Sequence, residues 1–206
     1  MKNTLILLIF LALFATSINS QSNWKISFKT GPAFSKSKYD PRNGTEKYGL
    51  GLSSGFDFYR FKKEHLFFKT GINYNLKVTN YSVVLNIDTT FESKSKGSHV
   101  TIPLMLGYRI NIDQHNFFVA AGLEIDYLFD MVQTSNLYGT ARWYSHSLEH
   151  LAPKYVLSIA YLNKINEHYS LMFNPEYSSN LGIRDILDNG DKIASWRFNF
   201  GIIYKY

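Results

Sequence analysis

The C-terminal segment, SWRFNFGIIYKY, alternates almost without a break between apolar and polar residues. One face of an extended strand would hold Trp196, Phe198, Phe200, Ile202, Tyr204 and Tyr206. The other face would hold Arg197, Asn199, Gly201 and Lys205, with Ile203 as the exception. Successive side chains of a strand point to opposite faces, so the pattern predicts a strand with one continuous apolar face.

The same alternation recurs in seven further segments, which predicts eight strands in all. The segments are 24–34, 48–58, 66–78, 99–110, 117–129, 151–161, 169–177 and 195–206. Strands of soluble domains usually have about 5 to 6 residues, whereas roughly 9 to 11 tilted residues are needed to cross a bilayer. The predicted lengths favour a membrane.

Alternation alone does not say which face is inside, because a soluble eight-stranded barrel around a ligand also alternates. Three features favour the membrane. The polar face is rich in Gly, Ser, Asn and Ala, which fit a narrow barrel interior. Short connections (60–65, 111–116, 163–168) alternate with long ones (35–47, 80–97, 130–150, 179–194), as in outer-membrane barrels. Tyrosines suited to membrane interfaces stand near the ends of the apolar faces, at Tyr48, Tyr108, Tyr127, Tyr161, Tyr169, Tyr177 and Tyr204.

The predicted fold is therefore all-β: an eight-stranded antiparallel up-and-down transmembrane β-barrel, monomeric and with a filled interior. Closure removes strand edges that would leave backbone groups unpaired in lipid. An even number of strands places both termini in one compartment, which we expect to be the periplasm.

Residues 1–20 have the organisation of a cleaved secretory signal peptide. Lys2 precedes an apolar run from Leu5 to Ala15, and small or polar residues follow from Thr16 to Ser20. Cleavage after Ser17 and cleavage after Ser20 both fit. The run is shorter than the roughly 20 residues of a spanning helix, so we expect residues 21–206 to form the barrel domain in the bacterial outer membrane.

Composition excludes some classes of function. The chain has no cysteine, which rules out disulfides and thiolate metal sites. The net charge of +6 comes from Lys and Arg that are scattered along the chain, so nucleic acid is not an expected partner. Aromatic residues make up 17% of the chain, and Tyr and Trp suit a surface that is apolar at one end and wet at the other.

From Trp24 to Tyr206 the chain resembles the outer-membrane β-barrel domain family, in particular its small PorT-like and OmpA-like barrels. The segments that carry the resemblance are SHVTIPLMLGYRI, at 98–110, and the stretch 180–206, in which a loop leads into FNFGIIYKY. The resemblance implies a barrel recognised by the outer-membrane insertion machinery through Phe198, Phe200, Ile202, Tyr204 and the terminal Tyr206. As an alternative role, it implies a component of a secretion or transport apparatus.

Charged residues on the polar face predict a network inside the barrel. Folding the chain about its connections brings Asp57 near Lys69 and Lys154 near Glu176. Plausible registers across the long loops bring Asp126 towards Lys154 and Glu176 towards Arg197. A charge in a narrow barrel must be paired or hydrated, so these six residues are expected to form structural salt bridges, with a polar plug or narrow conduit as the alternative.

Other candidate chemistry is less specific. His146, Glu149 and His150 are close in sequence but lack the HExxH order of a zinc site, so an exposed loop is expected and no metal or other cofactor is predicted. His146 with Ser147, or His99 with Thr101, would be the base and nucleophile of a lipid-modifying enzyme. Basic residues in the long segments are candidates to contact lipopolysaccharide phosphates: Lys36, Lys38, Arg42, Lys47, Lys94 and Lys96.

The sequence thus favours a non-enzymatic outer-membrane barrel whose long loops contact lipid, lipopolysaccharide, other envelope proteins or external ligands. Membership of a secretion apparatus is the alternative, and a lipid-modifying enzyme is the third. An interior of eight strands leaves no wide pore, so general diffusion is not expected.

Overall fold

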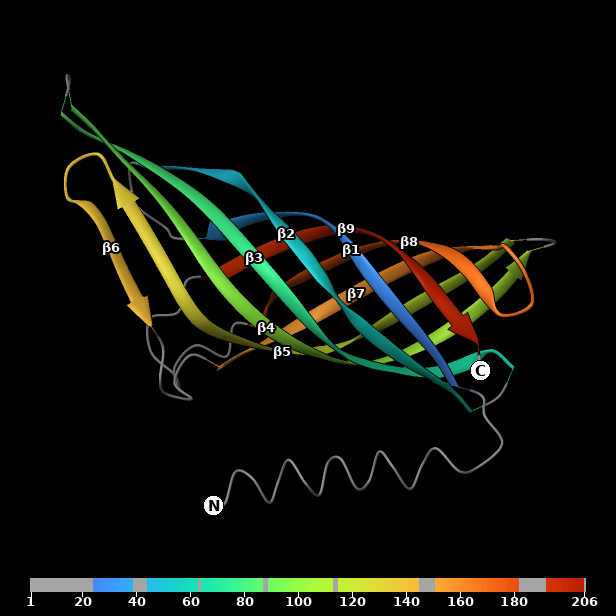
Figure 1. The fold of residues 1–206 in the computed structure, drawn as a ribbon. Coiled ribbons are helices and arrows are strands. Elements are labelled where there is room, and N and C mark those ends of the chain that lie inside the picture. The colour runs from blue at the N-terminus through green and yellow to red at the C-terminus, as the bar shows by residue number, and fades with distance from the viewer. Residues whose placement is uncertain are drawn as a thin grey trace, which may run out of the picture.

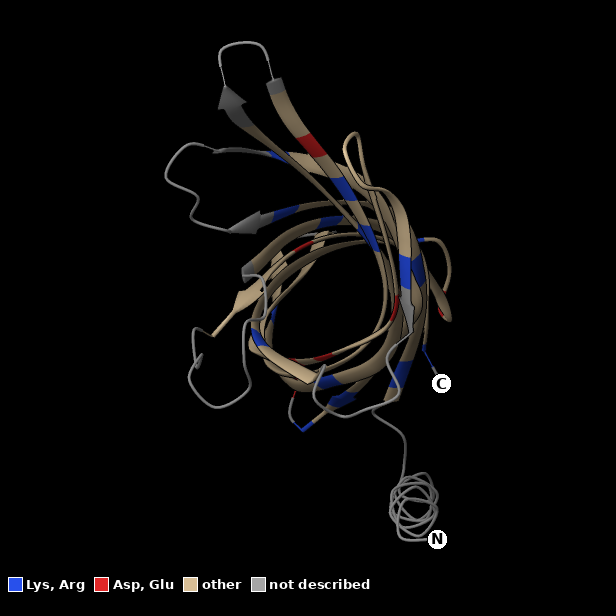
Figure 2. Cartoon of the chain, turned by 90° about the vertical axis from the view of Figure 1, so that its left-hand side faces the viewer, with Lys and Arg blue, Asp and Glu red and all other residues tan. Residues whose placement is uncertain are grey.

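Eight strands of the computed structural model close into an antiparallel barrel (Figure 1). The structure describes residues 24–38, 44–62, 64–86, 89–112, 115–144, 151–181 and 192–205. The barrel strands are β1 (Trp24–Lys38), β2 (Gly44–Phe61), β3 (Leu66–Asn86), β4 (Thr89–Ile112), β5 (His115–Ser135), β7 (Leu151–Lys164), β8 (Tyr169–Asn180) and β9 (Lys192–Lys205). Each pairs with its neighbours, and β1 pairs with β9 to complete the ring seen end-on in Figure 2. The predicted fold class is confirmed.

An additional strand, β6 (Gly139–Tyr144), pairs with the outer part of β5 and lies beyond the closed ring. It falls in the stretch 130–150, where the sequence predicted a long loop. The turn before it ends at Gly139, whose φ of 71° is a left-handed conformation that favours glycine. Asn136 ties this turn to β4, because its Nδ2 donates to the carbonyl of Thr90 and its Oδ1 accepts from the backbone N–H of Glu92.

The predicted long loop at 80–97 is also wrong, because most of it is a continuation of β3 and β4. These strands pair without interruption from Asn73 and Thr101 out to Val84 and Thr90. The regular alternation of apolar and polar residues weakens there, although the backbone pairing continues. Alternation marks the part of a strand that faces lipid, so it underestimates strands that project beyond the bilayer.

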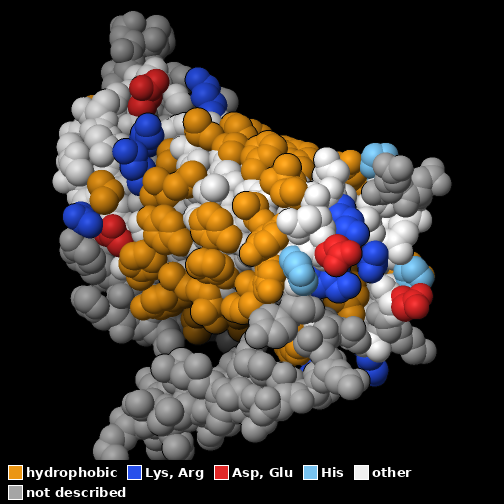
Figure 3. Space-filling model, turned by 45° about the vertical axis from the view of Figure 1, so that its right-hand side comes forward, with side chains coloured by type: hydrophobic (Ala, Val, Ile, Leu, Met, Phe, Trp, Pro, Cys, Tyr) orange, Lys and Arg blue, Asp and Glu red, His pale blue; other side chains and the backbone are white. Residues whose placement is uncertain are grey.

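Large apolar side chains of every barrel strand project outward and form an exposed belt (Figure 3). Leu106 is 66% exposed and Ile72 is 60% exposed, for example. Each barrel strand contributes at least one such residue, including Phe28, Phe56, Ile72, Leu106, Leu123, Ile159, Leu171 and Phe200. A soluble monomer rarely exposes so large a contiguous apolar surface, whereas a membrane-embedded barrel requires one.

Aromatic rings gather at both edges of this belt. At the end with the short turns, called the turn end below, Tyr169 lies 5.1 Å from Tyr204 and Tyr108 stacks on His65 at 5.4 Å. At the opposite end, the far end, the Tyr177 ring lies 4.8 Å from Trp196. Two aromatic girdles are typical of outer-membrane barrels. No helix among the described residues is long and apolar enough to span a membrane.

The interior of the turn end is filled by large apolar side chains rather than by the small polar ones that the sequence predicted. This aromatic core consists of Tyr59, Phe61, Phe67, Met105, Phe118, Ala120, Val156, Ala160, Leu162, Met172 and Ile203. The rings of Phe67 and Phe118 are 5.0 Å apart. Small residues on neighbouring strands make room for them, because a Cβ added to Gly107 would overlap the Phe67 ring.

Candidate functional site

The middle of the lumen holds a group of four charged side chains from four strands. Lys29 of β1 places its Nζ 2.9 Å from Asp57 Oδ2 and 2.9 Å from Glu176 Oε1. Lys69 of β3 places its Nζ 3.1 Å from Asp57 Oδ2 and 2.6 Å from Glu176 Oε1. We call Lys29, Asp57, Lys69 and Glu176 the central group. Each is at an inward position of its strand, so the strand alternation itself aims them at the barrel axis.

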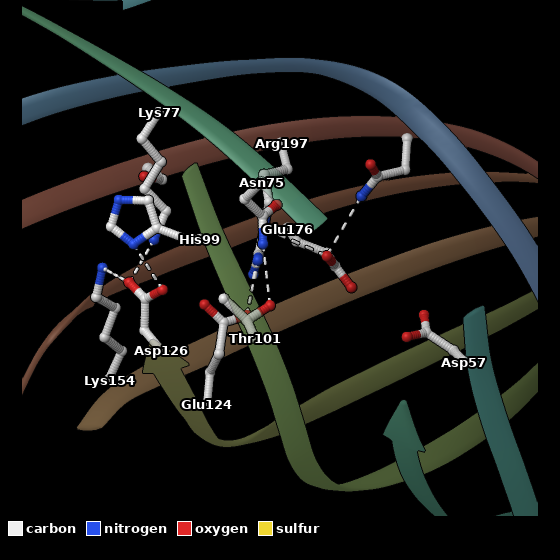
Figure 4. A network of polar contacts seen from close by, with 12 residues as sticks. Asp57, Asn75, Lys77, His99, Thr101, Glu124, Asp126, Lys154, Glu176 and Arg197 are labelled. Atoms are coloured by element: carbon white, nitrogen blue, oxygen red, sulfur yellow. Dashed lines mark hydrogen bonds and ion pairs between the residues drawn. The ribbon is translucent and has the colours of Figure 1, made fainter. Parts of the chain in front are cut away.

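A second group lies nearer the far end, around the carboxylate of Asp126 (Figure 4). Lys77 and Lys154 each place their Nζ 2.5 Å from Asp126 Oδ2, and His99 Nδ1 lies 2.9 Å from Oδ1. We call Lys77, His99, Asp126 and Lys154 the outer group. The Asp126 carboxylate therefore contacts three side chains, one each from β3, β4 and β7.

Arg197 of β9 connects the central group to Glu124, which stands beside the outer group on β5. Its Nη1 donates to Glu124 Oε2 at 2.7 Å, and its Nε lies 3.4 Å from Oε2 of Glu176 in the central group. Glu124 stands two residues before Asp126 on the same inward face of β5. The charges thus form one series along the barrel axis, which Figure 4 shows from Asp57 to Asp126.

Burial explains why the charges occur in near balance. Among the described residues, five buried cations (Lys29, Lys69, Lys77, Lys154, Arg197) face four buried carboxylates (Asp57, Glu124, Asp126, Glu176), and none of these nine is more than 2% exposed. His99 is 6% exposed. An unpaired charge in such a place costs several kcal/mol, on the order of 3 to 5. The arrangement packs the lumen and leaves its charges engaged with one another.

Amide groups add hydrogen bonds to Glu176 of the central group, whereas Oδ1 of Asp57 has no hydrogen-bond partner among the described residues. Asn174 and Asn199 donate from Nδ2 to the two oxygens of Glu176, at 3.0 and 3.3 Å. Ser158 in turn donates to Asn174 Oδ1 at 2.8 Å. A buried carboxylate needs such donors, because burial removes the hydrogen bonds that it makes to bulk water in the unfolded chain.

The structure places the six charged residues that the sequence singled out in this lumen, but not all in the predicted pairs. Asp57 contacts Lys69, Asp126 contacts Lys154, and Glu176 is directly opposite Arg197. The predicted approach of Lys154 to Glu176 is wrong, because Lys154 is opposite Asn180 and Glu176 is opposite Ser158. β7 runs on to Lys164, so the hairpin turns later than assumed and the register shifts by four residues.

Sequence reasoning missed four members of the network: Lys29, Lys77, His99 and Glu124. All four stand on the polar face of their segments, so the alternation already carried the signal that they point inward. Non-adjacent partners explain Lys29, which reaches Glu176 past β9, and Lys77, which reaches Asp126 past β4. They do not explain His99, which contacts Asp126 on the adjacent strand β5. Folding a chain about its hairpins finds only neighbours on adjacent strands.

Of the enzymatic candidates, the structure describes only His99 and Thr101, and both are engaged in other contacts. His99 is engaged with Asp126, and the hydroxyl of Thr101 accepts a hydrogen bond from Asn75 Nδ2 at 2.9 Å. The described residues contain no group of three or more His, Asp or Glu side chains placed to hold a metal ion. His146, Ser147, Glu149 and His150 lie outside the described residues, as do Arg42 and residues 1–20.

The predicted C-terminal assembly signal lies on β9. Phe200 and Ile202 project into the apolar belt, with exposures of 57% and 48%, and the rings of Phe198 and Tyr204 contact Phe34 and Tyr169. Tyr206 lies outside the described residues. Recognition of these residues by the insertion machinery stays a prediction.

Comparison with known proteins agrees with this geometry. A family model described as the outer membrane protein beta-barrel domain matches residues 19–188. No curated protein matches the chain.

The chain is also similar to solved structures of outer-membrane proteins. A major outer membrane protein from Thermus thermophilus is 11% identical with a TM-score of 0.53, and the match covers 90% of this chain and 100% of that one. Neisserial surface protein A is 12% identical with a TM-score of 0.49, covering 90% of this chain and 98% of that one. OprG from Pseudomonas aeruginosa is 12% identical with a TM-score of 0.48, covering 88% and 95%. The chain belongs to the outer membrane protein beta-barrel domain family and is an integral β-barrel protein of the bacterial outer membrane.

Proposed function

We propose that this protein is a non-enzymatic, non-conducting barrel that acts through the part of its wall that projects beyond the membrane at the far end. The observation that carries the proposal is the filled lumen: the aromatic core and the paired charges occupy the interior of the described barrel. Transport through the barrel would require breaking buried ion pairs, whereas contact through the projecting wall requires no change in the barrel. The wall consists of residues 79–86 of β3, residues 89–96 of β4, and residues 130–144, which comprise the end of β5, a turn and β6.

The outward face of β4 supports the placement of this wall outside the hydrocarbon. Along one face, Ile102, Leu104 and Leu106 belong to the apolar belt, and Lys96, Lys94 and Glu92 follow at exposed positions on the same face. The exchange from apolar to charged residues marks the edge of the lipid tails, because a charge on the lipid face is costly at the bilayer centre and tolerated at the interface.

Lys94 and Lys96, at this edge of the apolar belt, would contact phosphate groups of lipopolysaccharide. Arg142 of β6 lies two strands away, where it forms a two-point contact with Asp130 at 3.0 Å for each bond. Of the other basic residues in the predicted set, Lys36 places its Nζ 5.9 Å from the Tyr48 ring centroid at the same end. Contact with lipopolysaccharide implies that the far end faces outward and that both termini are periplasmic.

An aromatic cluster on the projecting wall would serve contact with envelope proteins or external ligands. Phe91 lies 6.3 Å from Tyr81 and 6.0 Å from Tyr138, which is 85% exposed. Leu137 beside it is 47% exposed. Exposed aromatic and apolar side chains well above the membrane belt are suited to binding rather than to lipid.

Site-specific photo-crosslinking in cells tests both the orientation and the lipid contact. A photoreactive residue at Lys94 or Lys96 should form adducts with lipopolysaccharide, and the same residue at Lys164 of the turn end should form none. Adducts from Lys164 alone would reverse the proposed orientation, and adducts from neither end would remove lipopolysaccharide as a partner.

Planar-bilayer recording tests the closed lumen. Purified protein should give no conductance steps above those of a protein-free bilayer. Glu176→Gln is recorded beside it, because this change removes a carboxylate charge from the central group and leaves its two lysines in excess. Stable conductance of the unmodified protein would defeat the proposal. Membership of a secretion apparatus, which the resemblance implies, also stays a prediction, and loss of protein export on deletion of the gene is the result that would support it.

We also propose that the C-terminal aromatic serves assembly more than stability. Deletion of Tyr206 should reduce membrane insertion in cells while refolding in detergent remains near normal. Equal losses in the two assays would count against a signal role.

A further inference from the structure

A cavity of about 570 Å³ opens at the turn end, beneath the aromatic core. Its apolar floor consists of Phe61, Leu162 and Ile203, which belong to that core. Its walls carry four basic side chains, Lys25, Arg109, Lys164 and Lys205, and the turns add Glu64, Glu167 and His168. A volume of several hundred Å³ with an apolar surface and a few converging polar groups is typical of a site for a small molecule.

The four basic side chains of the cavity have no carboxylate within ion-pair distance among the described residues. Every buried lysine or arginine of the lumen, in contrast, contacts a carboxylate within 3.4 Å. Counting the lining residues gives four basic and two acidic side chains, a formal excess of two positive charges. The cavity therefore has the electrostatic character of a site for an anion.

Two of these cations are held in place by the surrounding structure. Lys25 places its Nζ 4.8 Å from the Phe61 ring centroid and 5.2 Å from that of Phe118, so it lies against the floor. The guanidinium of Arg109 donates from Nε to Asn111 Oδ1 at 2.7 Å and from Nη2 to Asn116 Oδ1 at 2.9 Å. Among the described residues these contacts do not involve its Nη1, and a guanidinium fixed in this way recognises carboxylate or phosphate at a lower cost in side-chain entropy.

We propose that this turn-end cavity binds an amphipathic anion. A phosphate or carboxylate group would be bound by Lys25, Arg109 and Lys205. An apolar portion would pack on Phe61, Leu162 and Ile203. The site lies at the opposite end of the barrel from the projecting wall, and it goes beyond the proposed function.

Titration of the full barrel in nanodiscs of zwitterionic lipid tests the site. The probes are phenyl phosphate, inorganic phosphate and phenol, and binding is followed by NMR shifts of the protein. Phenyl phosphate should bind saturably, and inorganic phosphate and phenol should each bind about tenfold more weakly, because each retains only half of the recognised chemistry. Equal shifts with phenol and phenyl phosphate would indicate partition into the disc and would overturn the proposal. Equal affinities of phenyl phosphate and inorganic phosphate would overturn the role of the apolar floor.

Charge-neutralising variants give the matched comparison. Lys205→Gln and Arg109→Gln should each lower the affinity for phenyl phosphate about tenfold, which is the scale of one charge-assisted hydrogen bond. Lys62→Gln removes an exposed charge at the same end of the barrel that does not line the cavity, and its affinity should stay within twofold of the unmodified protein. Heat-modifiable gel migration reports folding of each variant. If Arg109→Gln does not fold, Lys205→Gln still decides, and equal affinities of Lys205→Gln and Lys62→Gln for phenyl phosphate would overturn the site.

A change of lipid separates the two sources of such an anion. Discs of phosphatidylglycerol should weaken phenyl phosphate binding to the unmodified protein if a lipid headgroup is the occupant. An unchanged affinity in those discs would identify a soluble anion as the occupant. Both results support the site, which is overturned only by the outcomes given above.

Discussion

The lumen and the turn-end cavity both contain clustered basic residues, but those of the lumen contact carboxylates and those of the cavity contact none among the described residues. In the lumen, Lys69 and Arg197 are at most 1% exposed and each contacts two carboxylates. In the cavity, Lys164 and Lys205 are exposed and contact none among the described residues. Water explains the difference, because a buried charge must be paired by the protein whereas an exposed one is hydrated and free to meet a ligand. The lumen charges therefore serve the fold, and the cavity charges are available for binding.

The largest expected effect comes from breaking the lumen network at its most connected carboxylate. Glu176→Gln removes the negative charge that Lys29, Lys69 and Arg197 share. The free energy of unfolding should fall by about 3 to 5 kcal/mol, since buried cations lose their partner. Urea unfolding in liposomes, followed by tryptophan fluorescence, measures it.

The control for that change is an ion pair in water. Arg142 contacts Asp130 on the projecting wall, where the Arg142 side chain is 55% exposed. Asp130→Asn should cost less than about 1 kcal/mol, because an exposed pair is screened by solvent. Equal costs for the two variants would contradict the distinction between lumen and surface.

The next largest expected effect on stability comes from overpacking the aromatic core, which separates the lumen charges from the cavity. Gly107→Ala places a methyl group against the Phe67 ring, which is packed on Phe61 and Phe118 and has little room to move. Overpacking of this kind costs about 1 to 3 kcal/mol, measured by the same urea experiment. Combining Gly107→Ala with Phe67→Leu should recover part of the loss, and strictly additive losses would show that the ring is not the obstacle.

The smallest expected effect is on the cavity side. Lys205→Gln should change the free energy of unfolding by no more than about 0.5 kcal/mol, since an exposed charge without a partner contributes little to stability. The same variant is expected to lower the affinity for phenyl phosphate about tenfold. Lys205 would then contribute to binding but not to stability. A destabilisation as large as that of Glu176→Gln would place Lys205 among the structural charges.

The sequence predicted the parts of the structure that depend on local alternation. Strands at 66–78 and 117–129 were predicted because their outward residues face lipid, which accepts only apolar side chains. The continuation of β3 to Asn86 and the strand β6 were missed, since strands beyond the bilayer face water on the outside and their outward positions are no longer required to be apolar. The aromatic core was missed for a related reason: inward positions of a barrel accept polar or apolar residues, so the alternation does not predict which of them hold large rings such as Phe67 and Phe118.

By itself the sequence determined the fold class, the lipid-facing side of each strand and the inward placement of the charged residues, because a period of two residues sorts side chains to opposite faces of a strand wherever it lies. Only the tertiary structure decided which charges meet. Closure of the ring brings Lys69 of β3 to Glu176 of β8 across the lumen, and it leaves Lys25, Arg109 and Lys205 together at the turn end without a carboxylate partner among the described residues. Such contacts depend on barrel diameter and strand register, which local alternation does not encode.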